Sequence, residues 1–417
     1  MNKIRDGYKM TELGEIPSEW KVKTIDDICY LNPDTLSNKT KENLLIEYID
    51  IESVTPRKIN GTKIFEFKDA PSRARRVVKK NDIIMSTVRP YLKAFAKINI
   101  DRENLVCSTG FAVLRVKENV NHEFVFQTIL SDYYIQQLSN KMVGSNYPAV
   151  NTSDVKESFI ILPPIEEQEK IASILSTVDE QIDNVDGLIE KNKELKKGLM
   201  QQLLTKGIGH TKFKKTEVGE IPEHWEVKKL KDLGNSIIGL TYSPDDLVEA
   251  GEGTLVLRSS NIKNSRIVFD DNKYVKTNIQ DKLIVKEDDI LICSRNGSKD
   301  LIGKCALIDK KTEGSSFGAF MTIYRSDYNK YLFNVFTSYM FKRQIYNNLG
   351  ATINQITTDN LNNFKVILPP INEQEEIASI LLKVDEKIDE YVNKKEKLEE
   401  LKKGLMQQLL TGNIRVY

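Results

Sequence analysis

The chain has 417 residues, which is too long for a single ordinary hydrophobic core. Its composition, 40% hydrophobic and 29% charged, is typical of globular proteins. No run of 18 apolar residues occurs and the first residues lack the apolar core of a signal peptide, so we expect neither a membrane span nor secretion. Four cysteines without close spacing and three scattered histidines argue against a metal site and predict reduced thiols in a cytoplasmic protein. The net charge of +1 argues mildly against nucleic acid, although the local distribution of charge matters more.

Three segments occur twice, about 206 residues apart, and divide the chain into two similar halves. They are GEIPSEW and GEIPEHW at 14–20 and 219–225, the related 22-residue blocks Leu162–Asp183 and Leu368–Asp389, and the identical KKGLMQQLLT at Lys196–Thr205 and Lys402–Thr411. The sequence between these blocks differs almost completely. One frame has therefore been built twice around two different inserts, as two related readers held at a fixed separation would require.

Each half is predicted to contain a mixed α/β domain, so the fold class is α+β. The GEIP segments predict turns before strands at Trp20–Val22 and Trp225–Val227. Alternating or apolar runs predict further strands at Tyr48–Ile51, Val77–Val78, Ile83–Met85, Phe111–Val116, Thr254–Leu257, Leu283–Val285, Ile290–Cys293 and Ala319–Tyr324. A single helix is expected at Glu123–Leu138 and another at Tyr331–Leu349, each followed by a polar loop, at Gly144–Asp154 and Gly350–Asn360.

A seven-residue apolar repeat follows each Pro-Pro pair and predicts a helix of roughly 39 residues, about 58 Å long. Because neither helix could bury its narrow stripe alone, we expect an antiparallel coiled coil; the alternative is that each helix packs only on its own domain. Polar Asn192, Lys196 and Lys402 fall on the seam, where they would lower stability and help to fix register. The predicted seam consists of Ile171, Leu175, Val178, Ile182, Val185, Ile189, Leu199, Leu203, Ile377, Leu381, Val384, Ile388, Leu398, Leu405 and Leu409.

Motifs of common enzymes are missing. There is no GxxxxGK[ST] phosphate loop, no HExxH and no GxSxG, and the isolated GxG at 251–253 lacks the rest of a dinucleotide fingerprint. The tetrapeptide of DNA amino-methyltransferases is also missing. Pro244-Asp245-Asp246 begins like a nuclease metal site without the Glu-x-Lys that would complete it, and Asp82, Asp288 and Asp289 are interpreted as turn residues. The sequence therefore predicts a non-catalytic protein without a metal site.

The polar segments near the strand ends suit contacts with DNA. The stretch Arg57–Lys80 holds nine basic residues against two acidic ones, a balance of +7 by subtraction. Arg and Asn can bond two atoms of a guanine or adenine edge at once, and Lys, Ser and Thr commonly hold phosphates. The alternatives are a solvated charged face, polar surface turns and local cap bonds. The candidate residues are Arg57, Lys58, Arg73, Arg75, Arg76, Ser86, Thr87, Arg89, Tyr91, Lys93, Asn146, Tyr147, Arg258, Ser260, Asn261, Arg295, Asn296, Ser298, Lys299, Thr352, Asn354 and Gln355.

The order of these blocks resembles the specificity subunits of type I restriction–modification systems. GEIPxxW, a variable insert, LPPxxEQxxIAxxLxxxDxxI and KKGLMQQLLT are repeated once over the whole chain. The resemblance implies two target-recognition domains, each reading half of a split double-stranded DNA sequence, and a coiled coil that sets the gap and docks two methyltransferase subunits. It also implies that S-adenosylmethionine, ATP and Mg act on partner methyltransferase and restriction/translocase subunits, and that this chain binds no cofactor and has no activity.

The resemblance divides the chain into a first recognition domain at 1–157, a first spacer helix at 158–210, a second recognition domain at 211–363 and a second spacer helix at 364–417. Half-sites about one helical turn apart, some 34–36 Å, would suit such an arrangement. Base-contacting residues cannot be carried over from the family, because the inserts are its variable part. Two other classes remain open: a scaffold that binds protein surfaces without base readout, and an enzyme with a degenerate site.

Overall fold

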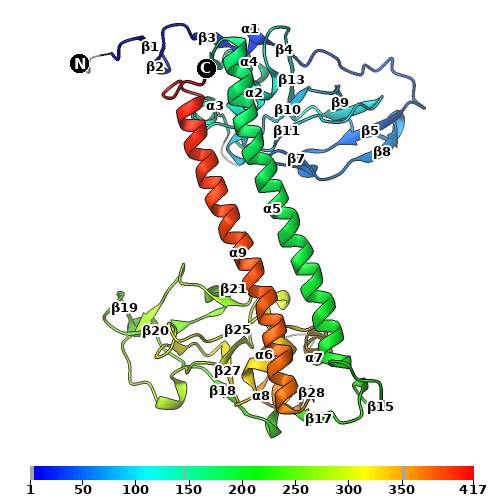
Figure 1. The fold of residues 1–417 in the computed structure, drawn as a ribbon, viewed down its shortest axis with the longest axis vertical. Helices are drawn as coiled ribbons and strands as arrows, with labels where there is room; N and C mark the ends of the chain where they lie inside the picture. The colour runs from blue at the N-terminus through cyan, green and yellow to red at the C-terminus, as the bar shows by residue number, and fades with distance from the viewer. Residues whose placement is uncertain (1–3, 145–146, 350–353) are drawn as a thin grey trace. The chain divides into compact units, whose positions relative to one another are not determined.

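The computed structural model describes residues 4–144, 147–349 and 354–417, which form two compact units. Unit 1 runs to Asp186 and includes Asn393–Tyr417, whereas unit 2 comprises Gly187–Val392. Each unit therefore contains one insert, the first part of the long helix that follows the insert, and the last part of the other long helix (Figure 1). None of the helices in the described ranges combines the length and the apolar composition that a bilayer crossing requires.

Two four-stranded sheets form the insert of unit 1. The first has the antiparallel order β11-β10-β13-β4, and the second has the order β8-β5-β12-β9 with β5 and β12 parallel. Their strands are β4 (Cys29–Leu31), β5 (Leu45–Ile49), β8 (Lys63–Glu66), β9 (Ala74–Val77), β10 (Ile83–Ser86), β11 (Phe95–Lys97), β12 (Leu105–Ser108) and β13 (Phe111–Val116). Strand β10 is an apolar run without alternation because both of its faces are covered: Ile83 and Met85 pack in the helix-covered core, and Ile84 packs in the core that includes residues of β5 and β12.

Unit 2 repeats this plan with a different sequence. Its sheets have the orders β18-β27-β24-β25 and β19-β23-β20-β26, with β20 and β26 parallel. The strands are β18 (Asn235–Ile238), β19 (Leu247–Val248), β20 (Thr254–Leu257), β23 (Tyr274–Val275), β24 (Ile290–Cys293), β25 (Cys305–Leu307), β26 (Ser316–Phe317) and β27 (Met321–Arg325). The pairing of β24 with β25 and β27 matches that of β10 with β11 and β13, so the internal repeat extends through the inserts.

Short hairpins and strand pairs complete each unit. In unit 1 they are β1 (Tyr8–Thr11) with β2 (Gly14–Pro17), β3 (Lys21–Thr24) with β14 (Phe159–Leu162), and β6 (Val54–Thr55) with β7 (Lys58–Ile59). In unit 2 they are β15 (Phe213–Thr216) with β16 (Gly219–Pro222), β17 (Glu226–Lys229) with β28 (Lys365–Leu368), and β21 (Ile262–Lys263) with β22 (Arg266–Ile267). Strands β3 and β14 join the start of the insert to its end, as β17 and β28 do in unit 2, and so place each insert at the entry of its long helix.

Several predicted elements need correction. The GEIP segments are themselves strands, because each pairs with the strand just before it. The predicted strand Leu283–Val285 is wrong: Leu283 ends a 3-10 turn, and the buried Val285 bonds through its N–H to the loop carbonyl of Ser315 (2.9 Å). Predictions for Phe111–Val116, Thr254–Leu257 and Ile290–Cys293 are confirmed.

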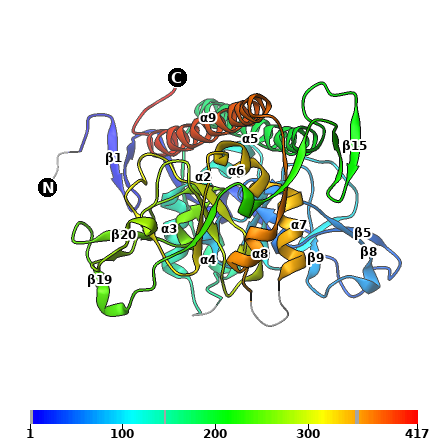
Figure 2. The ribbon, with the colours of Figure 1, turned by 90° about the horizontal axis from the view of Figure 1, so that it is seen from below.

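The helix predicted in each insert is two helices. They are α2 (His122–Ile129) and α3 (Asp132–Lys141) in unit 1, and α6 (Asn329–Thr337) and α7 (Tyr339–Asn348) in unit 2. The break falls at Ser131 and at Ser338, whose hydroxyl groups accept from the backbone of the following helix and donate to the carbonyl three residues back. A serine that caps a new helix in this way competes with continuation of the old one. In Figure 2, α6 lies next to the long-helix segments of unit 2.

The long helices are α5 (Ile165–Lys206) and α9 (Ile371–Leu409). Within unit 1, Asp179 pairs with Lys402 (2.7 Å) and Asp186 with Lys395 (2.7 Å). The first helix advances by seven residues between these pairs while the second goes back by seven. The two segments are therefore antiparallel, as predicted, and the alternative in which each helix packs only on its own domain is wrong.

Unit 2 contains the repeat-related ion pair, in which Lys196 contacts Asp385 at 2.7 Å. The seam prediction for Lys196 and Lys402 is thus confirmed as to position, whereas Asn192 donates to the carbonyl of Leu188 in its own helix (2.8 Å). Of the predicted apolar seam, Leu199, Val384, Ile388, Leu398 and Leu405 are half-buried. The buried members are Ile171, Leu175, Val178, Ile182, Val185, Ile189, Leu203, Ile377, Leu381 and Leu409.

The repeated motifs meet at the start of each long helix. Glu167, in the first turn of α5, accepts a hydrogen bond from the indole Nε1 of Trp20 (2.9 Å) and pairs with Arg415 (2.7 Å). Its neighbour Gln168 is buried and donates to the carbonyl of Pro163 (2.8 Å). A buried carboxylate needs such partners, because leaving it unpaired would be costly. The glutamate therefore ties the GEIPxxW block and the segment after α9 to the entry of α5.

The same arrangement recurs in unit 2. Glu373 accepts from the indole Nε1 of Trp225 (2.8 Å) and contacts Nε2 of His210 (2.8 Å), while Gln374 donates to the carbonyl of Pro369 (2.7 Å). Tryptophan, glutamate, glutamine and proline are thus identical in the two halves because they contact one another. The other side-chain partner of the glutamate differs, being Arg415 in unit 1 and His210 in unit 2.

Candidate nucleic-acid interface

In unit 1, three loops meet beyond the end of β10. Val88 forms an isolated bridge with Ala149, and the N–H of Arg89 donates to the carbonyl of Pro148 (2.8 Å). The hydroxyl of Thr87 donates to the carbonyl of Gly110 in the β12–β13 turn (2.9 Å). The loop after β10 and the loop after α3, which the sequence proposed separately, therefore form one surface together with the β12–β13 turn.

The equivalent loops of unit 2 make equivalent bonds. Arg295 forms a bridge with Gln355, and the N–H of Asn296 donates to the carbonyl of Asn354 (3.3 Å). The N–H groups of Ser294 and Arg295 both donate to the carbonyl of Phe320 in the β26–β27 turn (3.1 and 3.0 Å). Backbone pairing is kept while the side chains change, as expected for two readers of different sequences.

A fourth segment joins this surface in unit 2. The side chain of Asn296 donates to the hydroxyl of Ser259 (3.1 Å), which brings the loop after β20 next to the loop after β24. Within that segment, Arg258 pairs with Asp271 (2.7 Å). The buried Asn261 donates to the carbonyl of Val268 (3.1 Å). Both therefore hold the segment in shape, which weighs against their predicted role as direct contacts.

The remaining candidates of the two surfaces differ in accessibility. Ser86 is buried and bonds to the carbonyl of Val88 (2.9 Å), which is the local turn role. Lys93 pairs with Asp132 (2.9 Å). Tyr91, Tyr147, Arg295, Ser298 and Lys299 are exposed, whereas Thr87, Arg89, Ser260, Asn296, Asn354 and Gln355 are half-buried. Asn146 and Thr352 lie outside the described residues. Contact of these side chains with DNA stays a prediction.

The basic stretch 57–80 does not form one uniform cationic surface. Arg57 lies in the β6–β7 turn with φ of 68° and pairs with Asp179 and Asp183 of α5 (both 2.9 Å), and Lys58 pairs with Asp183 (3.1 Å). In unit 2 the equivalent hairpin is attached in the same way, through an ion pair between Arg266 and Asp389. These side chains hold the hairpins to the long helices, which weighs against the predicted phosphate contacts of Arg57 and Lys58.

Three other arginines of this stretch have different surroundings. Arg75 lies over the ring of Phe67 (4.6 Å to the centroid), and burial lowers the pKa of Arg76, which lies in β9. Arg73 is exposed, and its carbonyl accepts from Thr109 in the β12–β13 turn (2.8 Å). Arg73 is thus the arginine of the stretch placed best to contact DNA beside the loops of unit 1.

The loops rest on a rigid support. Arg115 makes two hydrogen bonds to Asp82 (2.9 and 2.7 Å), just before β10, and Arg325 makes the equivalent pair to Asp289, just before β24 (2.8 and 2.6 Å). Each aspartate also accepts from the backbone three residues earlier, so the predicted turn role is confirmed. Hydrogen bonds to the Asp82 carboxylate raise the pKa of Arg115. These bidentate pairs fix the strands that lead into the loops.

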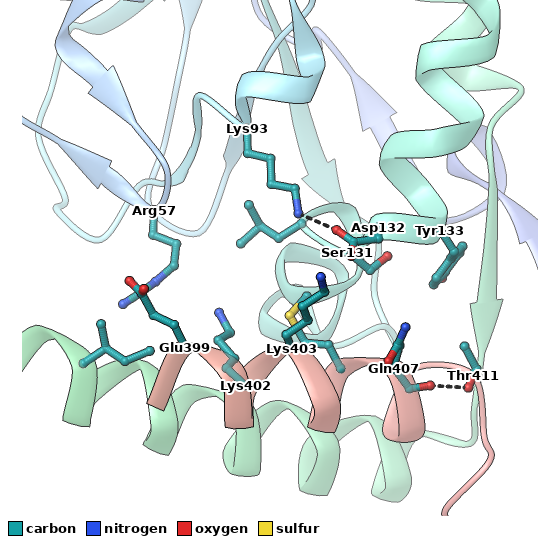
Figure 3. A pocket seen from close by; sticks show the side chains of 13 residues that line it. Arg57, Lys93, Ser131, Asp132, Tyr133, Glu399, Lys402, Lys403, Gln407 and Thr411 are labelled. Atoms are coloured by element: carbon teal, nitrogen blue, oxygen red, sulfur yellow. Dashed lines mark hydrogen bonds and ion pairs between the residues drawn. The ribbon is translucent and has the colours of Figure 1, made fainter. Parts of the chain in front are cut away.

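Each unit also has a cavity beside its copy of KKGLMQQLLT. The cavity of unit 1, of about 480 Å³, lies between Lys402, Lys403, Met406 and Gln407 of α9 and the start of α3 at Ser131 (Figure 3). The cavity of unit 2 has about 800 Å³ and is lined by the equivalent residues of α5 together with the start of α7. No sequence pattern indicates these cavities, because they form only where the repeated helix meets the insert.

Comparison with known proteins decides the family. The family model described as type I restriction modification DNA specificity domain matches residues 17–194 and again 222–402. The chain belongs to this family. The two matches coincide with the two inserts and their long helices, so the family's unit is the repeated frame.

Individual relatives agree over nearly the full length. A protein of Methanocaldococcus jannaschii that carries the provisional name type I restriction enzyme MjaX specificity subunit is 30% identical, over 99% of this chain and 97% of the relative. The MjaVIII specificity subunit of the same organism is 28% identical, over 96% and 94%. The solved type I restriction-modification system S subunit from M. genitalium has the same fold, with a TM-score of 0.57, 16% identity and 98% of both chains covered.

Proposed function

We propose that each unit reads one half of a split double-stranded DNA target and that the paired long helices set the gap between the halves. The observation that carries this proposal is the duplicated surface of loops: equivalent backbone bonds in both units present different side chains. Base edges in the major groove supply the differences that such side chains can read, at about 1–3 kcal/mol for each good bidentate pair. A scaffold for protein surfaces would not need two different side-chain sets on one frame.

An exchange of one insert tests this proposal. Residues 23–157 would be replaced by the corresponding insert of another family member, and methylated adenines would be mapped in a host that carries the system. We expect a changed first half-site with the second half-site and the reading of the target as two parts retained. A change in both half-sites, or in neither, would contradict the assignment of one reader to each unit.

Partner subunits are expected to supply the chemistry. In the proposed complex two methyltransferase subunits bind S-adenosylmethionine and methylate adenine, and restriction/translocase subunits use ATP and Mg, whereas this chain contributes recognition. Supporting evidence comes from KKGLMQQLLT, whose exposed residues Lys197, Gln201 and Gln202 are identical to Lys403, Gln407 and Gln408. Packing inside the units does not require identity at exposed positions. Identity there favours one kind of partner that binds twice, once beside each cavity.

The number of bound partners tests this docking site. Met200→Glu or Met406→Glu places a charge in one cavity, and the double variant places a charge in both. We expect the number of methyltransferase subunits per chain, measured by light scattering after co-purification, to fall from two to one in each single variant and to none in the double variant. Lys383→Glu, on an exposed part of α9 outside KKGLMQQLLT, is the matched control. Two subunits retained in the double variant would place docking elsewhere.

A further inference from the structure

Phe320 is an exposed aromatic ring on a fixed backbone. It ends the turn between β26 and β27, where its neighbours Phe317 and Met321 are buried, yet its side chain is 57% exposed. Its carbonyl accepts three hydrogen bonds, from the N–H of Ser294, the hydroxyl of Ser294 and the N–H of Arg295, all at 3.0–3.1 Å. A ring held in this way loses little conformational freedom on binding, which favours contact with a ligand over a role in packing.

A cation accompanies this ring. The guanidinium of Arg295 lies 5.2 Å from the centroid of Phe320, within the range of a cation–π contact. Arg295 is among the residues predicted to contact DNA, whereas Phe320 is not. Phe320 falls within Ala319–Tyr324, which is predicted from the sequence to be a strand. Phe320 and Arg295 thus present an apolar ring face next to a positive charge. Nucleic acid offers a base that can lie against the ring and a phosphate that can lie near the charge.

The other unit supplies its aromatic ring from a different loop. Gly110 takes the place of Phe320, since its carbonyl accepts the equivalent bonds from the N–H and hydroxyl of Thr87 (both 2.9 Å). An aromatic ring is still present, because Tyr147 of the loop after α3 is 74% exposed and has Arg89 at 5.1 Å from its centroid. Each surface therefore carries one arginine-backed ring, although the two rings stand on different loops.

We propose that Phe320 and Tyr147 stack on bases of the DNA target, one ring in each half-site. This inference rests on the proposed function and adds the residues that read through an aromatic face. The side chain of Phe320 has no group that could hydrogen-bond to a base edge, so we assign its contribution to the face of the ring. Because the rings stand on different loops, they reach different positions within their half-sites and contribute to the difference between the two recognised sequences.

Selection from a pool of randomised duplexes tests the inference. The full chain, assembled with the proposed methyltransferase subunits, would be compared as wild type, Phe320→Ala, Phe320→Leu and Phe320→Trp, and affinities would then be measured on the selected target. Stacking on an already unstacked base is worth roughly a 5- to 150-fold change in affinity, and in a duplex the opening of the base step offsets part of this gain. We therefore expect Ala and Leu to lose up to about that much affinity and Trp to retain binding. The loss should alter one half-site, and Tyr147→Ala should alter the other.

A matched control and the opposing results complete the test. Phe269→Ala removes another exposed ring of unit 2, 45% exposed, which lies in a cavity with Glu249, Glu252 and Asp270 and should leave binding unchanged. Full binding by Phe320→Leu would show that an apolar contact without a ring suffices, and an unaltered motif in Phe320→Ala would remove the residue from the interface; either result overturns the inference. Failure of the wild type to select a two-part motif would instead contradict the proposed function.

Discussion

The repeat-related ion pairs of the long helices offer a test within one molecule. The side chains of Asp179 and Lys402 are only 11% and 10% exposed, and Asp179 also pairs with Arg57 (2.9 Å) and accepts from Gln127 (2.8 Å). Burial lowers the pKa of Lys402 despite the neighbouring aspartate. Removal of the carboxylate by Asp179→Asn would leave two cations close together, one of them buried.

The matched variant is Asp385→Asn in unit 2. Asp385 is 26% exposed and pairs with Lys196, which is 22% exposed, so water can solvate the lysine that loses its partner. Loss of one partner of a buried pair costs about 3–5 kcal/mol, whereas exposed pairs contribute about 0.2–1 kcal/mol. For domains of 150–250 residues, these free energies correspond to a Tm lowered by roughly 6–20 °C for Asp179→Asn and by at most about 4 °C for Asp385→Asn.

Calorimetry of the full chain measures both shifts, and hydrogen exchange locates them. We expect faster exchange in 165–186 and 393–409 for Asp179→Asn, with the helix segments of unit 2 unchanged. Because a chain with two units need not unfold in one step, the local exchange rates carry the comparison. Equal effects of the two variants would refute the argument that burial decides what each ion pair contributes.

Three further outcomes are expected. The hydrogen bond from Arg115 lowers the pKa of Asp34, so the stabilisation from this pair is complete above the unfolded pKa near 3.9 and is lost as the pH falls through the lowered pKa. The Tm measured from about pH 6 to about pH 3 should therefore fall less steeply in Asp34→Asn. Arg415→Gln leaves the buried Glu167 without its cation and should destabilise unit 1 by about 3–5 kcal/mol in denaturant unfolding, whereas Arg415→Lys should retain most of the stability. Arg73→Ala should weaken binding to all duplexes alike and reduce the slope of log K against log salt by about one; a change limited to one base would contradict a phosphate contact.

The sequence predicted the elements whose patterns are long or repeated. The seven-residue repeat located both long helices and most of the buried seam, and the apolar run at Ile290–Cys293 located a strand covered on both faces. Short elements were harder, because a local hydrogen bond decided them: the hydroxyl of Ser131 ends one helix and begins the next, and the N–H of Val285 pairs with a loop. Neither bond leaves a periodic signal.

The candidate DNA-contacting surface was likewise predicted only where the sequence carries a clear pattern. Loops after buried strands were found because strand ends are visible in the sequence, and the structure brings those loops together as one surface in each unit. The basic stretch was a poor guide to the residues that contact DNA, because the composition of a segment does not show where its side chains point. Arg57 and Lys58 pair with aspartates of α5, whereas Arg73 stays exposed. Phe320 was missed because its exposure comes from a tight turn that composition cannot distinguish from a strand.

The duplication separates residues that hold the frame from residues that face partners. Trp20, Glu167 and Gln168 recur as Trp225, Glu373 and Gln374 because they bond to one another, so their identity needs no external cause. KKGLMQQLLT also recurs, but its identity extends to exposed positions that no contact within a unit explains. The loops, in contrast, retain their backbone bonds and exchange most of the side chains proposed to contact DNA. The two proposed docking surfaces and the two proposed readers are what a single protein would need to place two identical partners on an asymmetric target.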